Sequence, residues 1–569
     1  MPSFRERLEE THSSRFELGR HFFRRFFDSD FVSAPGQLRV VAGGLIAVLL
    51  SSSILFTVAY YHKYLELNKL DDPTPFRLAS IADVLFIISL SMALIGLFTT
   101  LQWTSLFPGL RDYLALAALP FRPRDLFIAK FAALSLCASA FVVATTALPS
   151  LVLPILQDGT HSSHAFLNIG GIFIASSLAA LFMFFLLVAL QGLLLNLLPL
   201  QHFQRISLTI QAALLVALLC AFPLILSIPN LHQSMALRPD WANWLPPLWF
   251  LGIHQVITGN HQAFATHLAW LGIASPFIAA ATATATYLWS YRRHRVRVLE
   301  STSSSHNRKD GSRFAGLLDF VFPDARRLAV FSFMAKTLAR SRPHRLILSG
   351  FTALALAVIF ETFIGLALSH HLKAIAPAAV SVPLALSLFV LAGFRYLFRL
   401  PVELRANWVF RLNESGNRLL FLSAVERFLG GFAILPVAII TLPVEITLLG
   451  PLPGIAATVL CIVPALILME VLLFEFDQIP FTSAYLPGRR PVIETLVLYG
   501  VAVILYVTVL GAAIAWSLSF AGYAGGFFIT GAAILWRIRS ARQDHWLIGK
   551  LLFEELPEPA VQTLNIYRD

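Results

Sequence analysis

Four carboxylates stand inside or beside long apolar stretches of this sequence: Asp83, Glu361, Glu445 and Glu470. A charge at membrane depth is costly, and such groups often bind protons, ions or substrates. Glu361 lies deepest in its stretch, so we expect either a proton-linked or substrate role or a partner on a neighbouring helix. Asp83 and Glu445 lie near the predicted outer ends of their stretches, which favours contact with interfacial water. Glu470 lies near the predicted cytoplasmic end, where an acidic loop begins.

Residues that support catalysis or cofactor binding form no recognisable arrangement. The phosphate-binding pattern G-x-x-x-x-G-K-[ST] does not occur, since Gly549-Lys550 is followed by Leu551. The zinc pattern HExxH does not occur either. The three cysteines lie too far apart for a CxxC site. We therefore expect no catalytic residues, no metal site and no cofactor, and we predict that the protein is not an enzyme.

Basic residues gather in two predicted loops, 103–125 and 398–424, and at the start of the helix that follows the first. Prolines break the first of these segments, which favours a short amphipathic helix at the membrane surface. Arginines on such a helix could dock a soluble partner through charge-assisted hydrogen bonds. The alternative is that they only fix the topology. The candidate partner-docking residues are Arg111, Arg122, Arg124, Lys130, Arg405 and Arg418.

The composition places these residues in a membrane protein. The chain is 57% hydrophobic and 13% charged, whereas soluble domains carry about 25% charged residues. A spanning helix needs about 20 apolar residues, and apolar runs of this length recur along the whole chain. We predict an all-α polytopic membrane protein with about twelve transmembrane helices in two six-helix halves. The predicted spans are 40–61, 81–102, 126–151, 170–195, 207–228, 267–291, 346–368, 379–397, 425–449, 455–474, 494–514 and 518–537.

The distribution of basic residues predicts the orientation. Lysine and arginine are abundant in segment 292–345 but absent from loops 152–169 and 450–454. The positive-inside rule therefore places both termini and segment 292–345 in the cytoplasm, with the plasma membrane as the expected location. The formal net charge of +11 then reflects loop arginines facing a bilayer, and we expect no nucleic-acid partner.

One loop departs from this rule. Segment 62–80 is predicted to lie outside, yet it carries Lys63, Lys69 and Arg77. Three acidic residues accompany them in the same loop. The sequence offers no further reason for the exception.

The two halves share residue pairs at a fixed offset of 294 residues. The matched pairs are Leu110-Arg111 with Leu404-Arg405, Leu126-Phe127 with Leu420-Phe421, and Leu148-Pro149 with Leu442-Pro443. We predict a first six-span half at 1–299 with an amphipathic N-terminal segment, a cytoplasmic linker at 300–325 and a second six-span half at 326–569. Because each half has six spans, an even number, the two halves would have the same orientation in the membrane. Two such halves are related by an axis along the membrane normal.

The third predicted span opens with Leu119-Pro120, then Arg124-Asp125-Leu126, then Lys130. This pattern resembles permeases of type-2 ABC exporters. The resemblance implies that the loop forms a coupling helix that contacts a separate ATP-binding subunit. It also implies that the chain is a membrane permease, which moves a substrate across the bilayer with energy supplied by that subunit.

The resemblance is better in the first half than in the second. The family has external helices between its fifth and sixth spans, where this chain has a tryptophan-rich segment, 229–266. That segment is expected to lie along the outer membrane surface, or else to pack its rings on the span ends. In the second half, Asn413-Glu414 replaces Leu119-Pro120, and loop 515–517 is too short for external helices.

The alternative function is a secondary transporter with two six-span halves, driven by an ion gradient. The first cytoplasmic loop lacks the Gly-x-x-x-Asp-Arg pattern of major-facilitator proteins. This absence favours the ATP-driven permease.

The predicted orientation can be tested by labelling single cysteines introduced at Ser303 and Gly159 into a background without the native cysteines. Because the two positions are predicted to lie on opposite sides of the membrane, an impermeant reagent added outside should label Gly159→Cys alone. Permeabilised cells, in which both positions should react, provide the control. External labelling of both positions in intact cells would overturn the topology.

Overall fold

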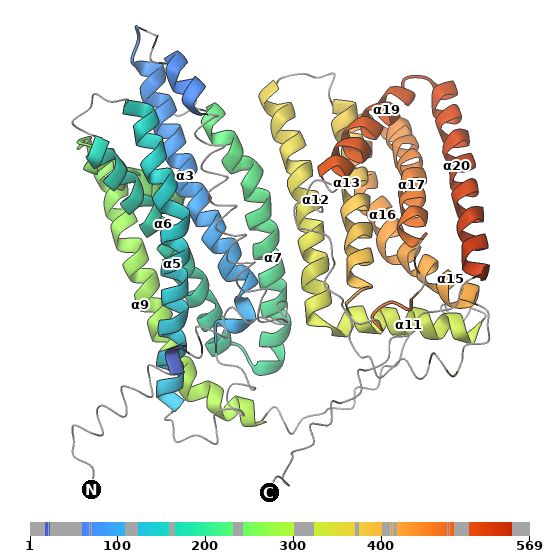
Figure 1. Cartoon of the computed structure of the whole chain (residues 1–569), viewed down its shortest axis with the longest axis horizontal. Helices are drawn as coiled ribbons and strands as arrows, with labels where there is room; N and C mark the ends of the chain where they lie inside the picture. Colours follow the sequence, from blue (N-terminus) through green and yellow to red (C-terminus); the bar gives the residue numbers. More distant parts are fainter. Residues whose placement is uncertain are drawn as a thin grey trace, which may run out of the picture. The chain divides into compact units, whose positions relative to one another are not determined.

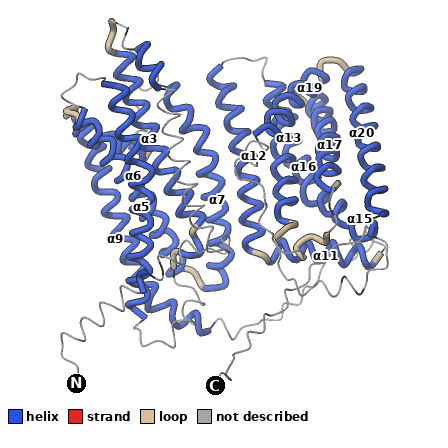
Figure 2. The backbone as a smooth tube through the Cα atoms, in the orientation of Figure 1, coloured by secondary structure: helices blue, strands red, loops and turns tan. Residues whose placement is uncertain are grey.

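The computed structural model describes a large part of the chain, as follows: residues 18–20, 22, 60–67, 69, 71–107, 123–158, 165–231, 243–300, 324–369, 375–400, 410, 412, 418–474, 476, 478–482 and 500–548. Their regular structure is helical, with no strand among them (Figure 2). Contacts divide the chain into two compact units, Met1–Asn307 (unit 1) and Arg308–Asp569 (unit 2). The division falls within segment 300–325, where a linker is predicted.

Ten helices among the described residues are long and apolar enough to cross a membrane. They coincide with the predicted spans from the second to the eleventh. The predicted span 40–61 lies almost entirely outside the described residues. At the last predicted span the structure has a helix, Ala521–Ile548, that is not one of the ten. The chain is an all-α, multi-pass integral membrane protein, because in lipid only a helix satisfies the backbone hydrogen bonds of such runs internally.

Unit 1 is arranged around helix α6, which packs against α3, α5 and α9 (Figure 1). Its buried positions include Gly171, Ala175 and Ala179, and small residues let helix backbones approach closely. Helix α7 packs mainly on α3. The elements of unit 1 are α3 (Thr74–Leu101), η1 (Trp103–Ser105), α5 (Pro123–Asp158), α6 (Ala165–Leu197), α7 (Leu200–Ser227), η2 (Ile228–Leu231), α8 (Pro246–Ile257) and α9 (Ala263–Glu300).

Helix α8 forms within the tryptophan-rich segment and packs on α9, α6 and α3. A Cβ atom on Gly252 would lie 2.7 Å from the backbone nitrogen of Ala269, and one on Gly272 would lie 2.6 Å from the carbonyl oxygen of Trp249. Only glycine allows the backbones of α8 and α9 to approach this closely. Phe250 of α8 is fully buried. Helix α8 is therefore an integral part of the helix bundle of unit 1.

Unit 2 is arranged around α13 and α17, with α11 lying across one end of its bundle (Figure 1). Helix α11 buries Val330 and Met334 and packs on α15 and α12, while Lys336 and Arg340 are exposed. The elements of unit 2 are α11 (Ala325–Arg340), α12 (Arg342–Ser369), α13 (Ile375–Leu397), α15 (Arg418–Leu429), η7 (Gly430–Ile434), α16 (Leu435–Leu449), α17 (Pro451–Leu473), η8 (Ile504–Val509), α19 (Leu510–Ser517) and α20 (Ala521–Ile548).

The two units share one order of helix packing. In unit 1, α6 packs on α3, α5 and α9, and in unit 2, α17 packs on α13, α16 and α20. Likewise α7 packs on α3, as α19 packs on α13. Pro149 within α5 and Pro443 within α16 are separated by the offset seen in the sequence. Helix α8 breaks the correspondence, because only residues 518–520 separate α19 from α20.

A buried ion cluster holds α20 against the rest of unit 2. Arg542 of α20 is 0% exposed; its Nε lies 2.5 Å from Glu470 of α17, and its Nη2 donates to Glu426 of α15. Arg539 lies farther from Glu426, at 3.5 Å, and is 53% exposed. Glu470 is thus part of a buried ion cluster, and the sequence-based interpretation that it merely begins a loop is wrong.

We expect Arg542→Ala to destabilise unit 2 by about 3 kcal/mol, because it leaves Glu470 buried without its cation. Arg539→Ala removes an exposed partner of the same cluster and should cost less than about 1 kcal/mol. Thermal unfolding of the purified protein in mild detergent measures both effects. Equal melting temperatures for the two variants would contradict the assigned role of Arg542.

Candidate functional site

A buried ion pair lies in unit 1, at the third turn of α3. Asp83 is 1% exposed. The Nζ of Lys63 lies 2.7 Å and 2.8 Å from its two carboxylate oxygens, and the hydroxyl of Tyr64 donates to Oδ2 at 2.6 Å. The interpretation that interfacial water surrounds Asp83 is therefore wrong, since protein groups enclose the carboxylate. The same interpretation is wrong for Glu445, which is 0% exposed and accepts a hydrogen bond from Thr458.

The hydrogen bonds continue from Tyr64 across three further helices. Gln157 of α5 donates through Nε2 to the Tyr64 hydroxyl at 2.8 Å. Asn168 of α6 donates through Nδ2 to Gln157 Oε1 at 3.2 Å. His254 of α8 lies with Nε2 2.8 Å from Asn168 Oδ1. We call the residues from Lys63 through Asp83, Tyr64, Gln157 and Asn168 to His254 the polar chain.

The charge of Asp83 fixes the direction of the hydrogen bonds nearest to it in the polar chain. A carboxylate only accepts, so Tyr64 donates to it and must use its oxygen to accept from the Gln157 amide. The carbonyl oxygen of Gln157 faces Asn168, which donates to it through its amide. The remaining oxygen of Asn168 accepts, so His254 carries its proton on Nε2. All donors therefore point toward Asp83.

The protonation states of His254 and Tyr64 agree with this order. Burial lowers the pKa of His254 to about 4, so the imidazole is neutral at pH 7 and has one N–H to donate. Burial, followed by the charge of Asp83, raises the pKa of Tyr64, which keeps its hydroxyl protonated. Gly171 of α6 leaves room for the ring, because a Cβ there would lie 3.1 Å from His254 Cδ2.

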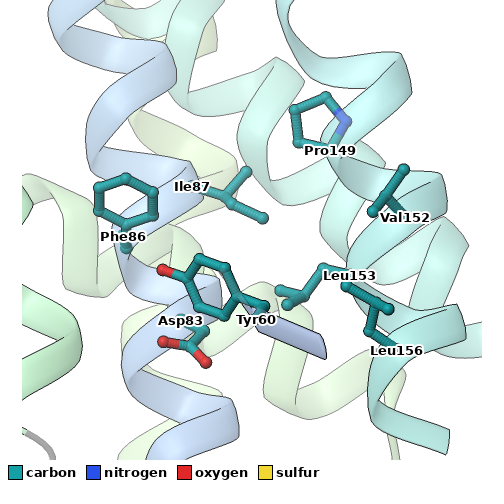
Figure 3. Close-up of a pocket in the computed structure, with 8 residues that line it drawn as sticks. All are labelled: Tyr60, Asp83, Phe86, Ile87, Pro149, Val152, Leu153 and Leu156. Atoms are coloured by element: carbon teal, nitrogen blue, oxygen red, sulfur yellow. The ribbon is translucent and has the colours of Figure 1, made fainter. Parts of the chain in front are cut away.

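A small cavity adjoins Asp83 between α3 and α5 (Figure 3). Its volume is about 20 Å³, enough for about one water molecule. The cavity is too small for an organic substrate, so unit 1 is closed at this point. The lining residues are Tyr60, Asp83, Phe86, Ile87, Pro149, Val152, Leu153 and Leu156.

The polar chain joins segment 60–67 to four helices, and two of its links do not titrate. Two of its links, Gln157 and Asn168, are amides, which donate and accept hydrogen bonds without taking up a proton at neutral pH. Among the described residues, no group of three or more His, Cys, Asp or Glu could hold a metal ion. What the arrangement does is tie segment 60–67 to α3, α5, α6 and α8 through directional bonds that hold only while those five segments keep their places.

The predicted docking residues lie elsewhere. Lys130 of α5 donates to the carbonyl oxygen of Phe107 at 3.1 Å and lies 5.4 Å from the ring centroid of Phe22, so its ammonium group joins segments within unit 1. Arg124 and Arg418 belong to the first turns of α5 and α15, with side chains outside the described part. The remaining predicted docking positions lie outside the described residues: Arg111, Arg122 and Arg405.

Glu361, the predicted intramembrane charge, is exposed on α12. Among the described residues, none forms an ion pair or hydrogen bond with its carboxylate. The structure thus brings Asp83, and not Glu361, into a polar site. A signal for Asp83 was present in the sequence, because Lys63 is one of the basic residues that contradict the positive-inside rule. The uncharged members of the polar chain gave no such signal.

We expect Lys63→Met to lower the stability of unit 1 by about 3 kcal/mol, because Asp83 would remain buried without its cation. Lys69→Met is the matched control, since Lys69 is exposed in the same loop and should have little effect. The double variant Lys63→Met/Asp83→Asn should recover part of the loss, because it removes the unpaired charge. Thermal unfolding in detergent gives the comparison; no recovery in the double variant would contradict the pairing.

Comparison with protein-family models, with curated proteins and with solved structures finds no match to this chain. Two features of the described residues bear on function: the two units share one order of helix packing, and unit 1 contains a polar chain that reaches α8.

Proposed function

We propose that the protein is a membrane permease of the type-2 ABC exporter class, which moves a substrate across the membrane with energy from a separate ATP-binding subunit. The observation that carries the proposal is the shared order of helix packing in units 1 and 2. Transport proteins are commonly built from two repeated halves. One chain with two such units supplies both halves of a transport pathway.

The proposed coupling to the ATPase uses the helices that follow the two arginine-rich loops. Arg124 lies in the first turn of α5, and Arg418 is the first residue of α15. Helix α5 packs on α6, while α15 continues through η7 into α16, which packs on α17. A movement of either loop caused by the ATP-binding subunit would thus be transmitted to a helix that contacts α6 in unit 1 or α17 in unit 2. Both loops and both termini are proposed to face the cytoplasm.

In this proposal the polar chain holds the outer end of unit 1 closed. Lys63 and Tyr64 lie in loop 62–80, which is predicted to be outside, and the polar chain ties them to α8 through α3, α5 and α6. Opening unit 1 at this end requires these bonds to break together, because each donor depends on the acceptor before it. The cavity beside Asp83 is too small for an organic substrate, which fits this closed state.

A secondary transporter driven by an ion gradient is the second candidate. The observation in its favour is the buried pair of Lys63 and Asp83, since ionisable groups within membranes often take part in ion coupling. The two candidates differ in their energy source. In vesicles, ATP-driven uptake that persists when a proton or sodium gradient is collapsed supports the permease, and the reverse result supports the second candidate.

We expect Arg124→Glu to reduce copurification of the ATP-binding subunit more than Arg418→Glu does. The first loop keeps the Leu119-Pro120 pattern of the resembling family, whereas the second does not. Reversing a charge in a buried interface pair typically costs about 2 kcal/mol or more, whereas an exposed charge matters little. Both variants are first checked for normal membrane insertion, and the amount of ATPase retained in mild detergent is then measured.

Equal retention of the ATPase in the two variants would refute the predicted asymmetry between the loops. Loss in Arg418→Glu alone would reverse it. If the parent protein retains no ATPase under any mild condition, the ATP-driven function itself is wrong.

A further inference from the structure

Glu445 of α16 is a buried carboxyl group whose surroundings differ from those of Asp83. It is 0% exposed within a candidate membrane span. Its Oε2 shares a hydrogen bond with the hydroxyl of Thr458 on α17. Its Oε1 has no hydrogen-bond partner among the described residues, and neither has the hydroxyl of Thr441, one turn earlier on α16. A single described hydrogen bond thus holds this carboxyl, whereas the ammonium group of Lys63 lies against Asp83.

The helices that pack on α16 bring no described cation to Glu445. Helix α16 packs on α17, α13 and η7, and η7 contains no ionisable side chain. Arg395 of α13 and Arg542 of α20 both lie at the end of α17 that carries Glu470. Glu470 is about 18 Å farther along α17 than Thr458. An ionised Glu445 would therefore be a buried charge without a described counter-charge.

The described titratable groups on the Glu445 side of unit 2 are a thiol and a phenol. Cys461, about one turn after Thr458, is buried and lies within electrostatic reach of Glu445. Tyr506 of η8 packs against the same apolar cluster as Cys461 and shares a hydrogen bond with Ser387. Neither group can become a cation. Because burying an unpaired charge is very costly, a carboxyl in such a place takes up a proton instead.

The hydrogen bonds of Thr458 need one more hydrogen than an ionised Glu445 leaves available. The Thr458 hydroxyl lies 3.0 Å from the carbonyl oxygen of Gly454 and also contacts Glu445 Oε2. A hydroxyl has one hydrogen, and carbonyl and carboxylate oxygens only accept. Beside an ionised Glu445, the two acceptors therefore compete for that hydrogen. A protonated carboxyl supplies the second one, so that Thr458 can donate to Gly454 while Glu445 provides the hydrogen of its own bond.

We propose that Glu445 is a proton-binding site of unit 2, occupied while α16 and α17 are packed as described. The proposal does not depend on the transport function proposed above. Glu445 lies about 8 Å along α16 from Gly450, the residue that separates the two helices. The proton therefore has a short path to the water at loop 450–454, which is predicted to lie outside.

Release of the proton would act on the packing of α16 against α17. A Cβ atom on Gly454 would lie 2.7 Å from the backbone nitrogen of Ile446, so the two backbones are too close for water to enter between them. A carboxylate formed at Glu445 gains free energy by reaching water, and it can do so only if this end of α16 moves away from α17. Proton binding at Glu445 thus favours the packed arrangement.

The test is the infrared spectrum at pH 7 of the full chain, with any subunit that copurifies, in mild detergent. A protonated carboxyl has a carbonyl band that an ionised carboxylate lacks, and an unperturbed glutamate is almost fully ionised at this pH. We expect the parent protein to show such a band that is missing from Glu445→Gln. Asp544→Asn is the matched control, because it removes an exposed carboxyl from the same unit and should leave the band unchanged.

Equal spectra of the parent protein and Glu445→Gln in this region would overturn the proposal, because Glu445 would then be ionised. Loss of the band when sodium is added at constant pH and ionic strength would also overturn it, since the site would then take a metal cation. Lys373 precedes α13 in the sequence and lies outside the described residues. A band that appears only in Lys373→Met would identify this lysine as a counter-charge and refute the protonated site.

Thermal unfolding in the same detergent gives a second readout. Glutamine resembles protonated glutamic acid in size and charge, so Glu445→Gln should melt at or above the melting temperature of the parent protein at pH 7. Raising the pH should favour the variant further, by up to about tenfold in the ratio of the two folding constants per pH unit, because folding of the parent then requires uptake of a proton. A variant that melts well below the parent protein at pH 7 would contradict the proposal, because the fold would then require the ionised carboxylate.

Discussion

A charge buried in a membrane protein must find its counter-charge within the protein, because hydrocarbon offers no water to solvate it. Each unit has a buried carboxylate that meets this constraint with a cation from another helical segment, whereas Glu445 of α16 is buried with a hydrogen bond from Thr458. In unit 1, Lys63 pairs with Asp83, and in unit 2, Arg542 pairs with Glu426 and Glu470. A buried pair is not by itself a strong source of stability, but breaking one is costly. Separating the helical segments that carry such a pair is therefore costly, so each pair keeps its segments together.

The two units use this constraint differently. In unit 2 the ion cluster joins α20, the last described helix, to α15 and α17. In unit 1 the carboxylate also orders a series of uncharged side chains, which extends through Gln157 and Asn168 to α8. Unit 2 has no room for an equivalent of α8 between α19 and α20. Among the described residues, the shared order of helix packing thus coexists with a polar chain found in unit 1, which is consistent with two halves that differ in their tasks.

Much of the fold could be predicted from the sequence, since the length and apolarity of a spanning helix are local properties. Ten of the predicted spans are helices of suitable length and composition. The candidate site could not be predicted in the same way. Gln157 and Tyr64 lie 93 residues apart in the chain, and His254 and Asn168 lie 86 apart. Nothing local distinguishes such polar side chains from those that face a loop.

The position of Lys63 in the structure explains part of the departure of loop 62–80 from the positive-inside rule. The positive-inside rule concerns basic residues that stay in water at the membrane surface, and Lys63 is directed into the protein by Asp83. Once Lys63 is set aside, Lys69 and Arg77 remain in loop 62–80, together with Glu66, Asp71 and Asp72. Asp72 in turn accepts hydrogen bonds from the backbone nitrogen and the hydroxyl of Thr74 at the start of α3, and these bonds lower its pKa. A basic residue on the wrong side of a predicted topology can thus indicate a buried acid, and here that acid is the residue on which the polar chain depends.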